Sequence, residues 1–354
     1  MAIQWSPSKG TLGTRRPGKA AATFFRSEGP RAWPARAFSQ GKRHDWLSRV
    51  QDIDRSARPG RQAADAPSCK TVRFADVGWT DIAATTAITS TILKGLGYAP
   101  KVQVLAVPVT YTSMKNKDID VFLGNWMPTM EADRKPYVDD KSVEVLNANL
   151  EGAKYTLAVP TYLYDAGLKT FADIAKFKDK LKGKIYGIEP GNDGNRLIIG
   201  MIKDDKFGLG KFEIVESSEQ GMLSQVERAT KRKEAIVFLG WEPHPMNTKF
   251  SIKYLEGGDD VFGPDLGGAT IYTNVRAGWL AECPNAGTLI KNLKFSLPLE
   301  NVVMGYILFD SMEADKAAEK WLKANPKVWE PWLKGVTTLD GKPGLEAVKA
   351  SLKI

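Results

Sequence analysis

The sequence predicts an α/β protein with mostly parallel, helix-covered sheets divided between two lobes. From residue 71 onward, apolar runs typical of strands alternate with helical patterns, which indicates parallel sheets covered by helices. A length of 354 residues suits two such lobes better than one. Three tryptophans each follow an apolar run that contains a glycine, and this context predicts indole rings at the sheet edge where α/β proteins bind ligands.

Residues 1–65 are predicted to form a disordered basic extension. They hold 13 Lys and Arg against 5 Asp and Glu, whereas the remaining 289 residues hold 37 against 36. The folded part is therefore nearly neutral, which argues against nucleic-acid binding by it. Five prolines, many arginines and the lack of a sustained hydrophobic period make ordering of the extension unfavourable.

The extension contains no recognisable signal peptide. Its longest small apolar run, residues 20–25, is shorter than a signal-peptide core of roughly 7–15 residues. The Arg-rich composition also resembles that of an organellar transit peptide. A misassigned start codon or a foreign fused segment would explain the extension equally well. No stretch of the sequence approaches the roughly 18 apolar residues that span a membrane.

The elements of the folded region are predicted in order from residue 71. The first strand, residues 71–77, leads into a helix at residues 81–96, with Thr80 or Asp81 as its cap and Gly97 in its terminator. Apolar runs predict further strands at residues 102–107, 121–123, 155–159, 184–188, 212–215, 235–239, 251–255 and 269–274. Helical periodicity predicts helices at residues 171–181 (after Thr170 as cap), 194–207, 219–231, 285–294, 299–311 and 314–324.

The three tryptophans are Trp79, Trp126 and Trp241, and they follow Gly78, Gly124-Asn125 and Gly240. A strand that ends in glycine turns sharply and leaves the next side chain at the edge of the sheet. Indole faces gathered there attract a cation that has no N–H to donate, such as a quaternary ammonium. The competing interpretation of each tryptophan is ordinary core packing.

Enzymatic motifs are weak in this sequence. Only His244 lies in the folded part and no Cys pair has ligand spacing, so no metal site or cofactor is predicted. The sequence lacks a nucleophile elbow, a P-loop and a dinucleotide-binding turn. Catalysis by the carboxylates of Asp81 and Glu242 stays open, although neither has a visible partner. The combination of tryptophans with acids favours recognition of a cation.

The two cysteines, Cys69 and Cys283, allow two interpretations. They are either two unrelated buried thiols or, if the protein is exported, a disulfide. Such a bond would join the start of the folded region to its C-terminal part.

From about residue 67 to the C-terminus, the sequence resembles the periplasmic choline-binding proteins of ABC importers, within the glycine betaine/choline group. The pieces that carry the resemblance are residues 75–81, 120–128, 155–164, 187–196, 237–246 and 321–341. It implies a type II periplasmic binding fold, with mixed, mostly parallel sheets and a ligand-binding cleft between two lobes. Residues 66–154 plus 246–354 are expected to form lobe 1, and residues 155–245 to form lobe 2. It also implies a monomer in the periplasm that delivers choline to an ABC import permease and is not an enzyme.

The same resemblance implies a four-sided aromatic box for the trimethylammonium group. Trp79, Trp126, Trp241 and Tyr155 correspond to its four sides, and Asp81 and Asn192 to the groups that hold the choline hydroxyl. The negative charge of Asp81 is expected to repel the carboxylate of glycine betaine. A receptor for betaine, carnitine or acetylcholine stays an alternative, as does an enzyme that acts on a quaternary amine.

Overall fold

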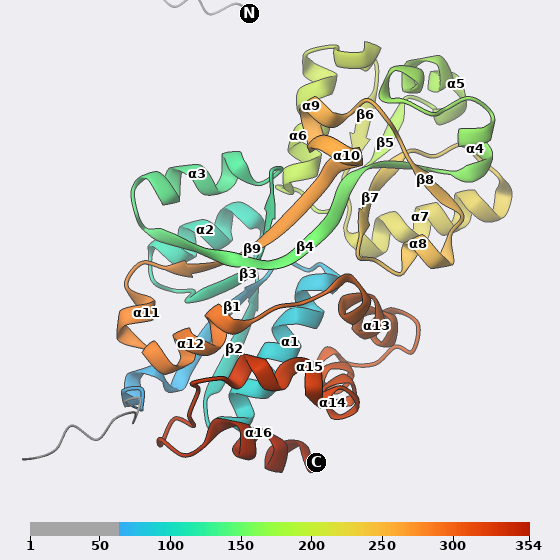
Figure 1. Cartoon of the computed structure of the whole chain (residues 1–354). Helices are drawn as coiled ribbons and strands as arrows, with labels where there is room; N and C mark the ends of the chain where they lie inside the picture. Colours follow the sequence, from blue (N-terminus) through green and yellow to red (C-terminus); the bar gives the residue numbers. More distant parts are fainter. Residues whose placement is uncertain (1–63) are drawn as a thin grey trace, which may run out of the picture. The chain divides into compact units, whose positions relative to one another are not determined.

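The structure, a computed structural model, describes residues 64–354 as an α/β fold built on nine strands (Figure 1). The strands follow the order β2-β1-β3-β9-β4-β7-β5-β6, and β8 pairs with β4. Their bounds are β1 Thr71–Asp76, β2 Ala99–Val104, β3 Val121–Met127, β4 Val143–Pro160, β5 Lys184–Tyr186, β6 Glu213–Val215, β7 Phe238–Glu242, β8 Ile252–Tyr254 and β9 Gly268–Arg276. The predicted basic extension lies outside the described residues up to residue 63.

The first lobe is built on β1, which pairs in parallel with β2 and β3. The C-terminal helices α13, α14 and α16 pack against α1, which runs from β1 back across the sheet (Figure 1). The helices before β4 and those after β9 are η1 Pro67–Lys70, α1 Thr80–Gly95, α2 Val107–Lys115, α3 Glu131–Asp139, α11 Trp279–Glu282, α12 Pro284–Asn292, α13 Leu297–Leu308, α14 Ala314–Ala324, α15 Pro326–Trp329, η4 Glu330–Leu333 and α16 Gly344–Leu352.

The second lobe is built on β5, which pairs in parallel with β6 and β7. Its 3₁₀ helix η2 starts with a capping box between Thr170 and Asp173, as predicted for Thr170. The helices between β4 and β9 are α4 Thr161–Asp165, η2 Phe171–Phe177, α5 Lys178–Leu181, α6 Asp193–Lys203, η3 Lys206–Gly208, α7 Glu219–Arg232, α8 Met246–Lys249, α9 Asp259–Phe262 and α10 Pro264–Gly267.

Two long strands, β4 and β9, connect the lobes. β4 has 18 residues, pairs with β9 along its first part and pairs with β7 from Lys154 to Ala158. After β7, β8 pairs with the end of β4, and α9 contacts α6. The predicted α/β class with two lobes and mixed pairing is confirmed. Across residues 64–354, no helix has the length and apolar content needed to cross a membrane.

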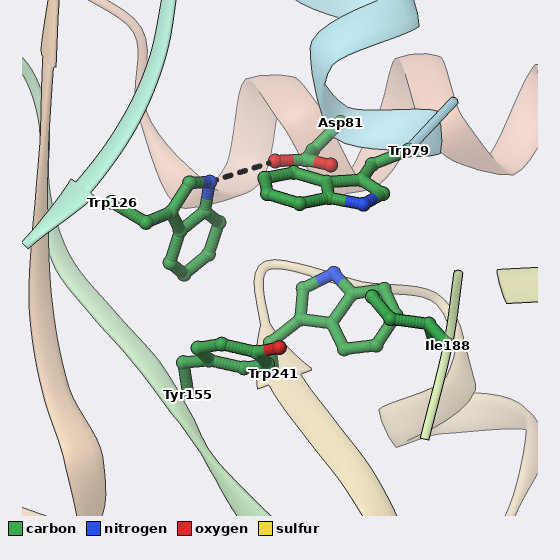
Figure 2. A pocket seen from close by; sticks show the side chains of 6 residues that line it. All are labelled: Trp79, Asp81, Trp126, Tyr155, Ile188 and Trp241. Atoms are coloured by element: carbon green, nitrogen blue, oxygen red, sulfur yellow. Dashed lines mark hydrogen bonds between the residues drawn. The ribbon is translucent and has the colours of Figure 1, made fainter. Parts of the chain in front are cut away.

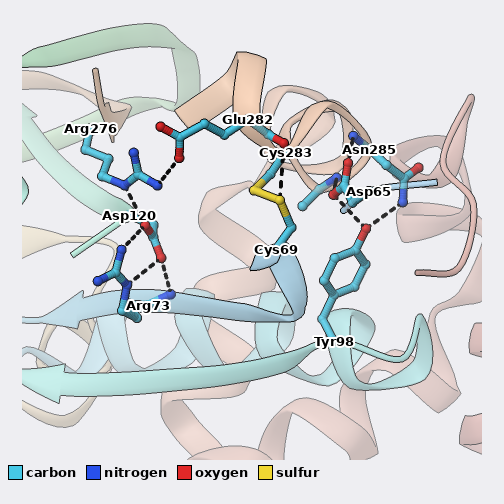
Figure 3. Close-up of a disulfide and its surroundings, with 10 residues drawn as sticks. Asp65, Cys69, Arg73, Tyr98, Asp120, Arg276, Glu282, Cys283 and Asn285 are labelled. Carbon is cyan, nitrogen blue, oxygen red and sulfur yellow. Dashed lines mark hydrogen bonds and ion pairs between the residues drawn. A yellow bond between two sulfur atoms is a disulfide. The ribbon is translucent and has the colours of Figure 1, made fainter. Parts of the chain in front are cut away.

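A disulfide between Cys69 and Cys283 ties the start of the folded region to α12 (Figure 3). Beside it, Asp65 is buried and accepts hydrogen bonds from the Tyr98 hydroxyl (2.9 Å) and the main-chain N–H of Asn285 (2.7 Å). Asp65 therefore belongs to the folded part and not to the extension predicted to end there. Hydrogen bonds from these donors offset part of the free-energy cost of burying the carboxylate.

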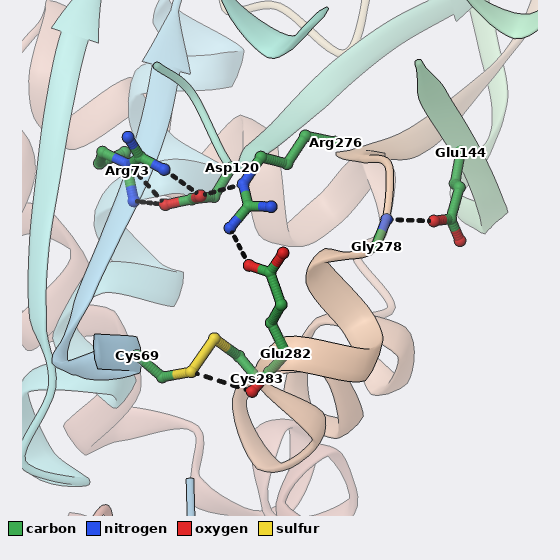
Figure 4. A network of polar contacts seen from close by, with 8 residues as sticks. All are labelled: Cys69, Arg73, Asp120, Glu144, Arg276, Gly278, Glu282 and Cys283. Carbon is green, nitrogen blue, oxygen red and sulfur yellow. Dashed lines mark hydrogen bonds and ion pairs between the residues drawn. A yellow bond between two sulfur atoms is a disulfide. The ribbon is translucent and has the colours of Figure 1, made fainter. Parts of the chain in front are cut away.

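The same end of the first lobe holds a charged network centred on Asp120 (Figure 4). Asp120 accepts hydrogen bonds from the guanidinium groups of Arg73 on β1 (2.6 Å) and Arg276 on β9 (2.7 Å). Burial acts to raise the pKa of Asp120, but the bonds from the two arginines outweigh it and lower that pKa. This network clamps β1 to β9 at the end of β1 opposite to Trp79.

Candidate functional site

Four aromatic rings enclose a small cavity between the two lobes (Figure 2). Its lining consists of Trp79, Asp81, Trp126, Tyr155, Ile188 and Trp241. All four rings are buried, with 3–6% of their surface exposed, so their faces are shielded from water.

Trp79 stands at the sheet edge in the way that the sequence predicts. Gly78 follows β1 with a φ of +83°, a conformation that glycine adopts without strain, and Trp79 is then the N-cap residue of α1. The turn sends the indole toward the second lobe, where its Nε1 donates to Glu189 Oε1 at 2.8 Å. The predicted cap of α1 is wrong, because no side chain of its own N-terminus caps this helix.

The prediction of a strand ending in glycine is wrong for the other two tryptophans. β3 runs through Gly124 to Met127 and β7 runs through Gly240 to Glu242, so both indoles lie on strands. These two glycines allow a neighbouring side chain to pack closely against the strand, and they do not form a turn. A Cβ on Gly124 would lie 2.6 Å from Ile82 Cδ1, and a Cβ on Gly240 would lie 2.9 Å from Ala158 Cβ.

The remaining walls are set by strand pairing. Tyr155 on β4 lies opposite Trp241 on β7, and their ring centroids are 6.2 Å apart at 84°. Trp126 on β3 meets Tyr155 at 5.9 Å and 63°. Behind these rings, Phe262 packs edge-on against Tyr155 and His244 against Trp241. Such perpendicular contacts hold aromatic rings in fixed orientations.

Asp81 supplies the charge of the site. Its side chain is 2% exposed, and its Oδ2 accepts a hydrogen bond from Trp126 Nε1 at 3.2 Å, whereas Oδ1 has no hydrogen-bond partner. Burial raises the pKa of Asp81 to about 8, and the nearby charge of Glu219 adds to this rise. A cation beside Asp81 would favour its ionised form, and a hydroxyl could donate to Oδ1.

Asn192 lies behind the cavity lining and reaches the cavity through Tyr155. Its Oδ1 accepts from the Tyr155 hydroxyl at 2.8 Å and also caps α6 by accepting from Asn195 N at 3.1 Å. The side chain is 1% exposed. In this geometry Asn192 orients Tyr155 and does not line the cavity.

Sequence reasoning missed the residues that support the rings. Ile188 lines the cavity, and Glu189, Glu219 and His244 contact ring-bearing segments from the second lobe. Burial raises the pKa of Glu189 to about 7. Glu189 lies shortly before the helix predicted from residue 194, but no pattern in the sequence indicates which partner it meets. Within residues 64–354, no group of three or more His, Cys, Asp or Glu side chains is arranged to hold a metal ion.

The chain is similar to solved binding proteins of ABC transporters. An ABC-transporter choline-binding protein solved in complex with choline is 65% identical, with a TM-score of 0.81; the match covers 81% of this chain and 100% of that chain. The unliganded semi-closed form of an ABC-transporter choline-binding protein, with the same identity and coverage, gives a TM-score of 0.75. Lactococcal OpuAC, closed around glycine betaine, is 25% identical, with a TM-score of 0.68 and coverage of 74% of this chain and 98% of that chain.

The family model that matches describes the substrate-binding domain of the ABC-type glycine betaine transport system, and it matches residues 70–324. This range includes every residue of the aromatic cavity. The chain belongs to this family of ABC-transporter substrate-binding proteins.

Proposed function

We propose that this protein binds choline in the aromatic cavity and delivers it to the permease of an ABC importer. The observation that carries the proposal is the combination of four buried rings with one carboxylate that has an unpartnered oxygen. The 65% identity to a choline-binding protein solved with choline supports the same ligand.

The rings suit a trimethylammonium group because that group carries charge but no N–H. Water solvates it weakly, so aromatic faces replace its water at low cost. Each well-placed face contributes on the order of 2 kcal/mol when it is desolvated, and immobilising the ligand opposes this gain. A net of about −8 kcal/mol, which corresponds to a roughly micromolar dissociation constant, is expected.

Asp81 is the proposed partner of the choline hydroxyl. Its Oδ1 accepts the hydroxyl hydrogen, and its charge faces the ligand cation across a cavity lined by buried side chains. Because charges interact strongly in such surroundings, the carboxylate of glycine betaine is repelled at the same position. In our proposal Trp79, Trp126, Tyr155 and Trp241 form the box, while Asn192 acts by holding the Tyr155 hydroxyl.

The two lobes are proposed to close around the ligand and to open for its entry. Trp79, Asp81 and Trp126 come from the first lobe, whereas Ile188 and Trp241 come from the second. The box is therefore complete only in the closed form, so ligand binding favours closure. The pairing of β8 with β4 favours a second lobe that extends to the start of β9, in place of an end at residue 245.

We also propose that the protein acts in the periplasm as a monomer, and that the closed form is the one the permease recognises. ABC-transporter substrate-binding proteins act outside the cytoplasm, which fits the disulfide between Cys69 and Cys283. The proposed activity is binding without chemical change of the ligand.

Isothermal titration calorimetry with choline, acetylcholine, carnitine and glycine betaine tests the proposal. We expect a roughly micromolar dissociation constant for choline and a dissociation constant at least about tenfold higher for glycine betaine. Preference for betaine would overturn the choline assignment while keeping the family function. Recovery of unchanged choline after prolonged incubation is expected, and chemical conversion would instead establish an enzyme.

A further inference from the structure

The N-terminus of α1 is capped by a residue of the opposite lobe. α1 has no side-chain cap of its own. Glu219, at the start of α7 in the second lobe, accepts hydrogen bonds from the main-chain N–H of Thr80 at 2.8 Å and from the Thr80 hydroxyl at 2.5 Å. A carboxylate at this position satisfies free helix N–H groups and complements the positive end of the helix dipole.

A third donor completes the cluster. His244 Nδ1 accepts from the main-chain N–H of Met246, which leaves Nε2 to donate to Glu219 Oε1 at 3.1 Å. Glu219, Thr80 and His244 are all at least 96% buried. Because a buried carboxylate without donors is costly, Glu219 requires these partners whenever the lobes are closed.

The cluster lies directly behind the walls of the aromatic cavity. Thr80 stands between Trp79 and Asp81 in the chain, and the His244 ring packs on Trp241 with centroids 4.9 Å apart. Glu219 itself does not line the cavity. It therefore connects a first-lobe wall to a second-lobe wall without touching the space that a ligand occupies.

We infer that Glu219 is a positioning residue, and that its bonds to Thr80 form a clasp that holds the closed lobes together and sets the residence time of the ligand. Opening of the lobes breaks both bonds to Thr80, because the two residues belong to different lobes. Loss of the clasp therefore speeds ligand release and has little effect on encounter with the open form. This inference rests on the proposed binding of a quaternary ammonium.

Stopped-flow tryptophan fluorescence with choline and tetramethylammonium tests the clasp. For Glu219→Gln, we expect the dissociation rate constant to rise at least about tenfold and the association rate constant to change by less than about threefold. The rise should be equal for both ligands, since Glu219 does not contact the choline hydroxyl. Glu227→Gln is the matched control on the same helix, because Glu227 bonds only to exposed lysines, and it should behave as wild type.

Thr80 offers a second pair of variants if Glu219→Gln folds poorly. Thr80→Val removes the hydroxyl bond and should raise the dissociation rate at least about threefold, whereas Thr80→Ser retains the hydroxyl and should match wild type. A dissociation rate within twofold of wild type for folded Glu219→Gln and Thr80→Val overturns the clasp. An effect seen with choline alone overturns it too, because it would place Glu219 at the ligand. If the wild-type protein binds neither choline nor tetramethylammonium, the proposed function itself is overturned.

Discussion

Tyr155 and Trp241 lie directly opposite each other in the antiparallel pairing of β4 with β7, with their rings at 84° and centroids 6.2 Å apart. The hydrogen-bond register of two strands therefore sets one corner of the aromatic cavity. A shift of β7 by one residue would turn the side chain of Trp241 to the other face of the sheet. Each wall of the cavity thus depends on main-chain geometry as much as on the ring itself.

Replacing one wall of the box should weaken ligand binding without unfolding the protein. For Trp241→Leu, we expect the dissociation constant for choline to rise at least about tenfold, because one cation–π face is lost. Calorimetric titration measures this change. Trp332→Leu is the control: Trp332 packs on Phe295 outside the cavity, so it should lower the melting temperature and leave affinity unchanged. Equal affinities for wild type and Trp241→Leu would place the site elsewhere.

Asp81→Asn should reduce the preference for choline over glycine betaine. Asn can still accept the Trp126 N–H, but the negative charge is lost, so choline affinity should fall at least about tenfold while betaine affinity falls less or rises. An unchanged ratio of the two affinities in calorimetry would contradict the role of Asp81.

Choline binding should strengthen as the pH rises toward 8. Burial raises the pKa of Asp81 in the closed protein from 3.8 to about 8, and Glu219 contributes to the rise. The carboxyl group of Asp81 therefore stabilises the closed ligand-free form most below about pH 4. This contribution to the stability of the closed form is lost as the pH rises through about 8. A bound cation favours the charged carboxylate, so binding releases a proton. Choline affinity should fall by up to about tenfold for each pH unit below 8.

The measurement is a choline titration at several pH values between 5 and 8, with Asp81→Asn as control. Glu219 and Glu300 are the other buried acids whose charges interact with Asp81, and burial raises the pKa of Glu300 well above its ordinary value. If Asp81 is the titrating group, the pH dependence should disappear in Asp81→Asn. A dependence that persists in the variant would assign the titration to another acid.

Gly194→Ala should disturb the site from outside the cavity. A Cβ on Gly194 would lie 2.1 Å from the Tyr155 hydroxyl oxygen, so the ring must move and its bond to Asn192 must weaken. We expect choline affinity to fall at least about tenfold. Gly200→Ala on the same helix meets nothing within 4 Å and should keep affinity while stabilising α6 by about 1 kcal/mol. Thermal unfolding and titration of both variants separate the two effects, and equal affinities would contradict the account of Tyr155.

Loss of the disulfide should affect stability and not ligand binding. Cys69 and Cys283 are 214 residues apart, and the chain-entropy model assigns on the order of 5 kcal/mol to closing so long a loop. The bond lies at the opposite end of β1 from Trp79. Cys69→Ser/Cys283→Ser should therefore lower the urea midpoint strongly with choline affinity within twofold of wild type, and two free thiols in unreduced wild type would contradict the bond.

The sequence predicted the parts of the site that depend on local signals. The turn at Gly78 and the helix predicted from residue 194 follow from residue type, and most predicted helices match within a few residues. The roles of Gly124 and Gly240 were mistaken, because a glycine needed for close packing and one needed for a turn look the same in sequence. The first part of β4 was missed, since its asparagines and glycine lack a strand pattern.

The contacts between the lobes could not be predicted from local sequence patterns. Glu219 caps a helix that begins 139 residues earlier, and Trp79 donates to Glu189, which is 110 residues later. These pairs meet only because two lobes close on each other. Sequence periodicity reports which face of an element is buried, but it does not report which distant residue covers that face.

The most direct test of the account is a crystal structure of the protein with choline. We expect the ammonium nitrogen to lie within about 6 Å of the ring centroids of Trp79, Trp126, Tyr155 and Trp241, with the choline hydroxyl donating to Asp81. Choline bound outside these rings, or an empty aromatic cavity at saturating choline, would contradict it.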